Sequence, residues 1–406
     1  MRLGDNKMEI CNRDSCTGCS ACAQACPVGC ITMEETEEGF SYPVIDEEKC
    51  VHCLKCVNTC HINQPSLQTH HPTYYMGTHN DIEVLKRSSS GGAFTALADY
   101  VLRRKGVVYG ASFSAETNTV EHIAVSDRDE LDLIRLSKYY QGGINGCYKK
   151  VREDIKDRLV LFSGTACQIA GLYGYLGKDS KSENLITVDV LCHGAASKKV
   201  VEAYIKCKEK KYKKKIVDFR FRVKPDDSDW LNGGGTRMRL DFEDHTSRVQ
   251  SKEYDTYFVG FNHYLFLRKS CYSCKYCGGE RIADFTLADY WGVPENEISE
   301  REKKYGVSLI LCNSERARSM LGDLQQDMSV KEIDPARAIA CNQALRLPST
   351  NNPDRSSFFK ELNDHNFDKL VYKYLRSYYI KTFLRQTAIK IMGEEQFRRW
   401  RYRKRQ

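Results

Sequence analysis

Two cysteine-rich stretches near the start of the chain decide its fold: CTGCSACAQACP at residues 16–27 and CVHCLKCVNTC at residues 50–60. In each, two residues separate three successive cysteines, and three residues separate the third from a fourth. The candidate metal ligands are Cys16, Cys19, Cys22, Cys26, Cys50, Cys53, Cys56 and Cys60. This doubled spacing is typical of chains that hold two [4Fe–4S] clusters. A pair of zinc sites is the alternative, but structural zinc sites usually combine separated CxxC pairs.

The spacing also predicts how two clusters would share these ligands. In the bacterial-type two-cluster ferredoxin pattern, the fourth cysteine of each stretch binds the other cluster. The first cluster then takes Cys16, Cys19, Cys22 and Cys60, and the second takes Cys50, Cys53, Cys56 and Cys26. We expect an α+β ferredoxin domain at residues 1–68, in which Cys11 and Cys30 are small buried residues rather than ligands. His61 stands where a proline usually follows, which affects the loop but not ligation.

The length and composition suit a soluble protein with two or three cores. The chain has 406 residues, of which 41% are hydrophobic, and it contains 19 cysteines. No apolar run reaches the roughly 18 residues of a membrane-spanning helix, and the start lacks a signal-peptide core. We therefore expect a cytoplasmic protein with reduced thiols. The formal net charge of +8 does not indicate nucleic-acid binding, since a cluster with four thiolates carries about −2.

Beyond a polar linker at residues 64–72, patterns of helix and strand alternate. Residues 159–163 and 185–191 are short apolar runs typical of buried strands. Each run leads into a helical pattern, the first at residues 166–176 and the second from Lys198. Such alternation predicts an α/β domain with a mostly parallel sheet.

This α/β domain is expected to begin near residue 73. An apolar helical stripe runs through residues 94–102 and is followed by an apolar strand at residues 107–113. We assign residues 73–155 and 156–345 to two parts of one α/β domain, and residues 346–406 to a helical, basic tail.

Five motifs in this region occur together: SSSGGAFTAL (88–97), LSKYYQ (136–141), FSGTACQIAGL (162–172), LCHGAAS (191–197) and SCYSCKYCGGERIADFTLADYWG (270–292). Their combination and order resemble the coenzyme F420 hydrogenase/dehydrogenase beta-subunit family. The resemblance covers roughly residues 11–315, ferredoxin block included. It implies an α/β flavoprotein that carries FAD and one further [4Fe–4S] cluster. Members of the family act on deazaflavin, chlorophyll-type pigments and other, less defined substrates.

The resemblance places the ligands of this third cluster at Cys167, Cys192, Cys271 and Cys274. The secondary structure expected from the sequence agrees with this ligand set. Cys167 and Cys192 each follow an expected buried strand and so belong to the same carboxyl edge of the sheet. A CxxC loop can close over that edge. The alternative is two structural cysteines and a zinc knuckle.

The chain departs from the family motifs close to these cysteines. Ala166 and Ala196 stand where prolines are usual, and Ala288 stands where a glycine is usual. Cys277 is an extra thiol beside the CxxC pair and competes with Cys274 for the fourth ligand position. We therefore expect a cavity lining that differs from that of members acting on deazaflavin.

A flavin needs a place for its anionic pyrophosphate. Ser90, Gly91 and Gly92 open a helix, where free backbone N–H groups suit such an anion, and Thr95 adds a hydroxyl. An ordinary helix cap is the alternative. The family motifs add Lys138, Tyr139 and Gln141 as flavin contacts, and place the isoalloxazine ring near the turn at Gly164 and Thr165.

Four further residues match the family motifs beside the third cluster. His193 follows a proposed ligand, and could tune the cluster or donate a proton to substrate as a catalytic residue. A histidine held for structure alone is the alternative. Arg281, Asp284 and Asp289 lie beside the CxxC loop, where they either orient ligands or contact substrate.

These patterns predict an iron–sulfur flavoprotein oxidoreductase. Electrons would pass between the ferredoxin clusters, the third [4Fe–4S] cluster and FAD, and reduce a small organic or sugar-derived substrate. The alternatives are a non-catalytic electron-transfer subunit that feeds a partner enzyme, a coenzyme F420 oxidoreductase, and a zinc-stabilised interaction module. A ferredoxin or another redox protein is the expected partner.

Two basic segments bear on partners. Residues 206–215 carry seven lysines and form either a solvated helix face or a docking site for an acidic redox protein. In the tail, an apolar stripe precedes the basic run at residues 397–405. The stripe is expected to contain Leu370, Tyr374, Leu375, Tyr378 and Tyr379. Such a helix either packs on its own domain or rests on an anionic membrane.

Overall fold

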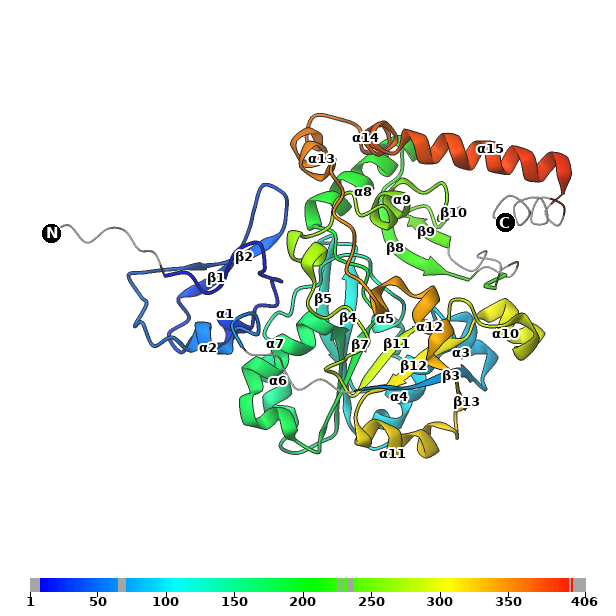
Figure 1. Ribbon diagram of the computed structural model, residues 1–406. Coiled ribbons are helices and arrows are strands. Elements are labelled where there is room, and N and C mark those ends of the chain that lie inside the picture. The colour runs from blue at the N-terminus through cyan, green and yellow to red at the C-terminus, as the bar shows by residue number, and fades with distance from the viewer. Residues whose placement is uncertain are drawn as a thin grey trace.

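The computed structural model describes residues 8–64, 71–224, 227, 229–231, 237–393 and 396. Residues 8–64, called the small lobe here, lie against one side of a larger α/β body (Figure 1). Most of the expected linker at 64–72 and the whole basic run at 397–405 fall outside the described residues. Within the described part of the chain, no helix is both long and apolar enough to cross a membrane.

The small lobe is built from two halves with the same backbone conformation. It contains the helices α1 (Ala21–Ala25) and α2 (Lys55–Thr59) and the hairpin strands β1 (Ile31–Glu35) and β2 (Ser41–Ile45). Gly18 and Ser20 in the first half, and His52 and Leu54 in the second, all have positive φ. Left-handed residues alternating with right-handed ones turn backbone N–H groups toward one side of a loop, which suits an anionic group there.

An eight-stranded sheet forms the centre of the body. Its strand order is β13-β3-β12-β11-β7-β6-β4-β5. The strands are β3 (Thr73–His79), β4 (Val107–Ser114), β5 (Thr119–Val125), β6 (Val160–Thr165), β7 (Leu185–Val190), β11 (Phe285–Asp289), β12 (Ser308–Cys312) and β13 (Met328–Glu332). The four central strands, β11, β7, β6 and β4, are parallel. The expected parallel sheet is thus confirmed at the centre, while the flanking strands on both sides pair antiparallel.

Helices cover both faces of this sheet. On one face lie α6 (Cys147–Asp154) and α7 (Ala166–Leu176), packed on alternate residues of β4 and β6. On the other face lie α4 (Ala93–Leu102) and α11 (Glu315–Leu324). The remaining short helices of the body are α3 (Ile82–Lys86), α5 (Leu131–Ile134), α10 (Glu300–Tyr305) and α12 (Pro335–Cys341). Loops at the carboxyl ends of the parallel strands therefore open between two helical layers, as expected for an α/β binding site.

A second core lies beside the sheet and is rich in aromatic residues. Its elements are α8 (Lys198–Tyr212), β8 (Ile216–Val223), β9 (Arg237–Phe242), β10 (Ser247–Ser251), α9 (Thr256–Asn262), α13 (Arg355–Glu361) and α14 (Phe367–Tyr374). The lysine-rich segment at 206–215 is only partly a solvated face, because Lys208 is buried and its Nζ lies 2.9 Å from Asp368 Oδ1. The last described helix, α15 (Arg376–Met392), projects from this region (Figure 1).

Helix α7 holds the small lobe against the body. A Cβ on Gly171 would lie 2.8 Å from Cys19 Sγ, and one on Gly174 would clash with the carbonyl oxygen of Thr59. The missing side chains at these two positions, which are three residues apart on one helix face, allow the lobe to approach the helix backbone. His61 adds to this contact: its ring bonds the hydroxyls of Thr17 and Tyr276, and its carbonyl accepts from Lys275 Nζ.

Candidate functional site

The eight cysteines of the small lobe fall into two groups. Cys60 lies close to Cys16, Cys19 and Cys22, which is the set predicted for the first cluster. Cys26 lines a small hollow together with Cys50, Cys53 and Cys56, the set predicted for the second. Burial raises the pKa of Cys19 to about 12, because an isolated thiolate is poorly solvated there. Iron ions would offset that cost, so the donor sets fit two iron–sulfur clusters.

The two surplus cysteines contact the predicted ligands. Cys30 is buried, with its Sγ 3.4 Å from Cys26 Sγ. Cys11 is only half-buried, and its thiol hydrogen-bonds both Cys16 and Cys60. This hydrogen bond from Cys11 lowers the pKa of Cys16 to about 6. The sequence carried no signal for this contact, because thiols near ligands need no fixed spacing.

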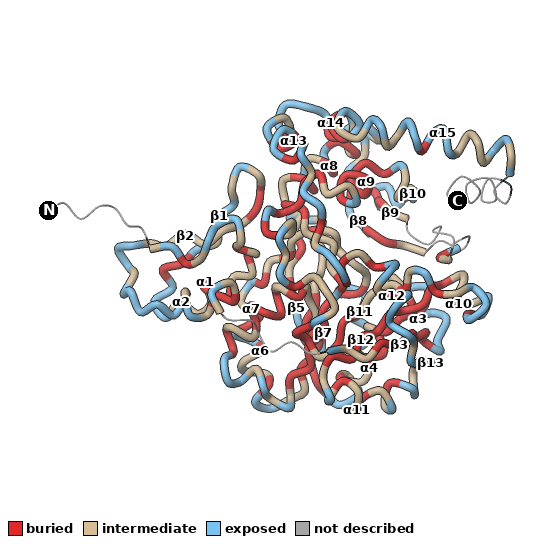
Figure 2. Tube along the Cα trace, in the orientation of Figure 1, coloured by how far each residue is buried: buried red, intermediate tan, exposed pale blue. Residues whose placement is uncertain are grey.

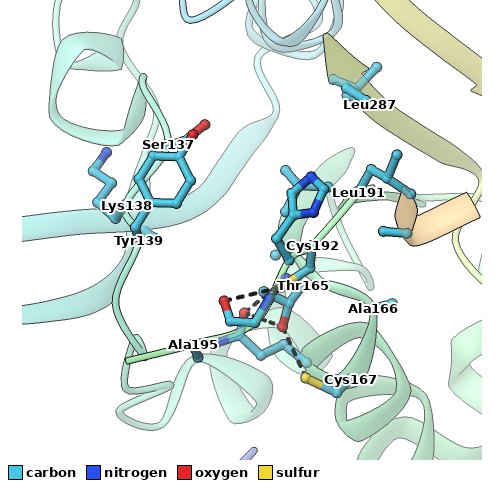
Figure 3. Close-up of a pocket in the computed structure, with 18 of the residues that line it drawn as sticks. Ser137, Lys138, Tyr139, Thr165, Ala166, Cys167, Leu191, Cys192, Ala195 and Leu287 are labelled. Atoms are coloured by element: carbon cyan, nitrogen blue, oxygen red, sulfur yellow. Dashed lines mark hydrogen bonds between the residues drawn. The ribbon is translucent and has the colours of Figure 1, made fainter. Parts of the chain in front are cut away.

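A large cavity of about 860 Å³ opens at the carboxyl ends of the parallel strands. Figure 3 shows Lys138 and Tyr139 on one side of it, across from Thr165, Cys167 and Cys192. The predicted cofactor residues that line it are Ser90, Gly92, Thr95, Lys138, Tyr139, Gln141, Gly164 and Thr165. Gly91 does not, because its Cα packs against the backbone of Gly77 and Ser308. All five motifs, which are far apart in the sequence, thus contribute to the lining of one cavity.

Five of the six cysteines that line the same cavity belong to the sequence motifs, and the sixth is Cys341. Cys167 occupies the first turn of α7, Cys192 follows β7, and Cys271 lies in a short 3-10 helix at Lys269–Ser273. Cys274 and Cys277 complete the set. The Thr165 hydroxyl lies 3.1 Å from Cys167 Sγ, and the Gly194 amide donates to Cys192 Sγ over 3.3 Å. Such donors stabilise thiolates, so this set fits a further cluster.

The CxxC loop offers two candidates for the last ligand position. The Cys277 thiol hydrogen-bonds Cys274 and lowers its pKa to about 7, while raising its own. Cys274 is therefore the thiol that ionises more readily. The geometry still leaves both sulfurs at the cavity, so the competition expected between them stays open.

The residues of the helix-opening motif are already partly bonded within the protein. Ser90 Oγ donates to the carbonyl of Val307 over 2.8 Å, and Thr95 Oγ1 accepts from Arg135 Nε over 3.2 Å. Gly92 has a φ of 87° and caps α4. Both readings of this motif, as a helix cap and as part of the cavity wall, therefore apply to the same residues.

The motif at 136–141 connects the cavity with the small lobe. Burial lowers the pKa of Lys138 to about 7, and its ammonium donates to the carbonyls of Leu133 and Arg135. Tyr139 is held edge-on against the Phe261 ring, with 4.9 Å between centroids. Gln141 Nε2 donates to the carbonyl of Thr17 in the small lobe over 3.1 Å.

His193 faces the cavity from the loop after β7. Its carbonyl accepts a 2.7 Å hydrogen bond from Ser349 Oγ. Its ring nitrogens have no hydrogen-bond partner among the residues that the structure describes. Burial lowers the pKa of His193, so the neutral ring is favoured. A neutral, unbonded imidazole is free to exchange a proton with a bound molecule.

The three charged residues expected to orient ligands or contact substrate differ in role. Arg281 and Asp189 form a buried ion pair with 2.8 Å between Nη2 and Oδ1, and Arg281 also donates to the carbonyl of Tyr276 in the CxxC loop. Asp284 accepts hydrogen bonds from the amide and hydroxyl of Thr187. Arg281 thus holds the CxxC loop in place, while Asp284 joins the start of β11 to β7.

Asp289 instead faces the cavity, where it pairs with a residue that sequence reasoning missed. Arg222 Nη1 lies 2.6 Å from Asp289 Oδ2, and both side chains are largely buried. A shift of register between Arg220 and Val223 interrupts the alternation of β8 and leaves Phe221 and Arg222 buried side by side. The sequence pattern carries no trace of such a bulge.

Comparison with known proteins identifies the two parts of the chain. Residues 157–337 match the family described as the C terminus of the beta subunit of coenzyme F420 hydrogenase/dehydrogenase, and residues 15–63 match a 4Fe-4S dicluster domain. The resemblance inferred from the motifs is confirmed. The chain thus combines an iron–sulfur electron-transfer domain with a domain related to the beta subunit of these oxidoreductases.

Among solved structures, the chain is similar to one from a xenon-derivatised F420-reducing [NiFe] hydrogenase complex of Methanosarcina barkeri. The sequence identity is 15% and the TM-score is 0.46, over 77% of this chain and 94% of that one. A search of curated proteins gives no match.

Proposed function

We propose that the chain is an iron–sulfur flavoprotein oxidoreductase. Electrons would pass between two clusters in the small lobe, a third [4Fe–4S] cluster and FAD, for reduction of an organic substrate. The observation that carries the proposal is the meeting of five motif cysteines and all five motifs in one cavity. Cys19 also packs against α7 at Gly171. The same helix bears Cys167, four residues before Gly171.

The electrostatics of the cavity suit an anionic cofactor. Among the described residues that line it, seven are lysines or arginines and one, Asp289, is a carboxylate. The cationic residues are Arg135, Lys138, Arg222, Lys252, Arg268, Lys275 and Arg281. Lys138 and Lys252 form no ion pair with any described carboxylate. Fixed cations in a partly desolvated cavity favour phosphate and similar anions.

The proposed cofactors assign roles to the residues. Cys167, Cys192, Cys271 and Cys274, or Cys277 in its place, would hold the cluster. Ser90, Gly92 and Lys138 would face the pyrophosphate, and His193 would exchange the proton that accompanies reduction. FAD, when bound, supplies the conversion between single electrons and a hydride.

The first test is the cofactor content of the chain. We expect about 12 iron atoms and one flavin per chain, from three four-iron clusters and one FAD. Iron and flavin are measured on anaerobically purified and reconstituted protein. About 8 iron atoms would remove the third cluster while leaving the small lobe intact, and a colourless zinc protein would refute the whole proposal.

The main rival is a non-catalytic subunit that hands electrons to a partner enzyme. Both functions need the clusters, so cofactor content does not separate them. Turnover of a small organic substrate by the isolated chain, with a reduced ferredoxin as donor, supports the enzyme. Oxidation of the reduced chain only in the presence of a partner protein supports the subunit.

The substrate is expected to be something other than coenzyme F420, with a sugar-derived compound as the candidate. The fused small lobe lets electrons arrive singly from a ferredoxin, and Ala166 and Ala288 line the cavity in place of the usual proline and glycine. The chain is photoreduced anaerobically and mixed with coenzyme F420 or with a metabolite panel. Fast, stoichiometric flavin reoxidation by coenzyme F420 would show this expectation to be wrong.

Peripheral contact with a membrane remains part of the proposal, but through a different face of the tail. The predicted stripe packs inward: Leu370 is buried, and Tyr378 donates to the carbonyl of Glu253. The exposed apolar side chains of α15 are Ile380, Phe383, Leu384 and Ile391, with Ile391 79% exposed. Figure 2 shows how little of α15 is buried. This helix carries four cations and no carboxylate, which suits an anionic lipid surface.

Vesicle binding tests this face. The double variant Phe383→Ser, Leu384→Ser should bind vesicles of phosphatidylcholine and phosphatidylserine at least about tenfold more weakly, since burial of each side chain contributes about 1.5–3 kcal/mol. Leu347→Ser is the matched control, because Leu347 is 62% exposed but lies outside α15. Equal binding of all three proteins, or a dimer through α15 without vesicles, contradicts the membrane assignment.

A further inference from the structure

Arg268 lies at the junction of the small lobe and the body, and its side chain is buried. Its Nε donates to the carbonyl of Cys16 over 2.7 Å, and its Nη2 donates to the carbonyl of Ser41 over 3.0 Å. Its Nη1 donates to Gln141 Oε1 over 2.9 Å. The guanidinium also lies over the Tyr42 ring, 4.1 Å from the centroid. The Arg268 side chain thus contacts a predicted cluster ligand, the hairpin of the small lobe and the motif at residues 136–141 at the same time.

This guanidinium has no carboxylate partner among the described residues. An uncompensated buried charge is costly, so buried arginines are normally paired. The group that comes closest to supplying a negative charge is the thiol of Cys16, whose sulfur lies 3.8 Å from Nη2. The carbonyl of Arg268 also accepts a hydrogen bond from the amide of Cys271 over 3.0 Å. Arg268 therefore lies between the ligands proposed for two different clusters.

A second arginine at the same interface shows what is unusual here. Arg355 is buried as well and lies near the Phe40 ring, as Arg268 does. However, Arg355 forms two hydrogen bonds of 2.9 and 2.6 Å with the carboxylate of Glu38 in the small lobe. The charge of Arg355 is thus neutralised by a carboxylate of the protein, whereas the charge of Arg268 is not neutralised by any described carboxylate.

We propose that Arg268 is the counter-charge of the cluster held by Cys16, Cys19, Cys22 and Cys60, and that it raises the reduction potential of this cluster. The inference rests on the proposed function. Reduction makes a cluster more negative, and a fixed positive charge in a buried site stabilises that state. The electron is thereby favoured on the inner cluster, beside α7, over the outer one at the exposed Cys53.

A redox titration of the anaerobically reconstituted full chain, followed by electron paramagnetic resonance, tests this role. Arg268→Met should lower the midpoint potential of one small-lobe cluster by at least about 59 mV, a tenfold change for one electron. Arg268→Lys keeps the charge and should shift the potential less. Gln141→Glu places a carboxylate beside the guanidinium and should also lower the potential, without removing the arginine.

The double variant Arg355→Met, Glu38→Gln is the matched control, because it removes a buried arginine from the same interface together with its own carboxylate partner. Its cluster potentials should equal those of the wild type. Unchanged potentials in both Arg268→Met and Gln141→Glu would overturn the proposal, as would an equal shift in the double variant Arg355→Met, Glu38→Gln. If the wild type itself shows no small-lobe cluster signals, the proposed function fails instead.

Discussion

Replacing Cys167 by serine should remove about four iron atoms from the chain and leave both small-lobe clusters in place. Cys167 lies on α7, the helix that packs against Cys19 at Gly171. The variant should still accept electrons in its small lobe, but flavin reduction by a ferredoxin should be largely lost. Iron analysis and stopped-flow absorbance measure the two effects separately.

Two further variants make this result specific. Cys147→Ser changes another buried thiol of the body, but Cys147 does not line the cavity and should keep all iron. Cys26→Ser should disturb only the second small-lobe cluster, for which Cys26 supplies the crossed ligand. Full iron content in Cys167→Ser would exclude Cys167 as a ligand.

Replacing Arg281 by methionine should destabilise the body by about 3–5 kcal/mol, because it leaves Asp189 buried without a partner. Neither side chain of this pair is more than 2% exposed. The free energy of unfolding is measured by urea titration under anaerobic conditions. Adding Asp189→Asn removes the stranded charge and should recover part of the loss.

An exposed ion pair provides the comparison. Lys156 and Glu153 lie 2.6 Å apart, but both side chains are more than half exposed. Lys156→Met should therefore change the unfolding free energy by no more than about 0.5 kcal/mol. A loss below about 1 kcal/mol for Arg281→Met would mean that water reaches Asp189.

Local patterns in the sequence predicted the parts of the fold that depend on neighbouring residues. The helix expected at residues 166–176 has those bounds in the structure, because its apolar spacing and its cap are both local. The strands β3, β12 and β13, which form one side of the sheet, were not predicted. Their antiparallel pairing joins segments more than 200 residues apart, and no local pattern encodes such partners.

The tail shows how a small local break changes a face. The predicted apolar stripe treated residues 370–379 as one continuous helix. In the structure the chain breaks at Leu375, which has φ −114° and ψ 25°, so that α14 and α15 are separate helices. The change of phase turns the tyrosines inward and leaves Phe383 and Leu384 exposed.

The same distinction between local patterns and contacts with distant residues applies to the candidate site. The cysteines and glycine-rich turns were found because their chemistry requires fixed spacing. Arg222 and Arg268 were missed, since each acts through contacts with distant residues. The bond from Arg268 to Cys16 joins positions 252 residues apart, and lysines and arginines are too common on surfaces for such a residue to stand out.

The glycine face of α7 has a consequence for how electrons would travel. Cys19 packs directly on the backbone of α7 at Gly171, and the carbonyl of Thr59 packs on Gly174, so no side chain of α7 separates the small lobe from the helix at these two positions. The small lobe would then transfer electrons from a fixed position, without moving between an outside donor and the body. The rate of electron transfer within such a chain should be insensitive to solvent viscosity. Only the encounter with a separate donor protein should slow as the viscosity rises.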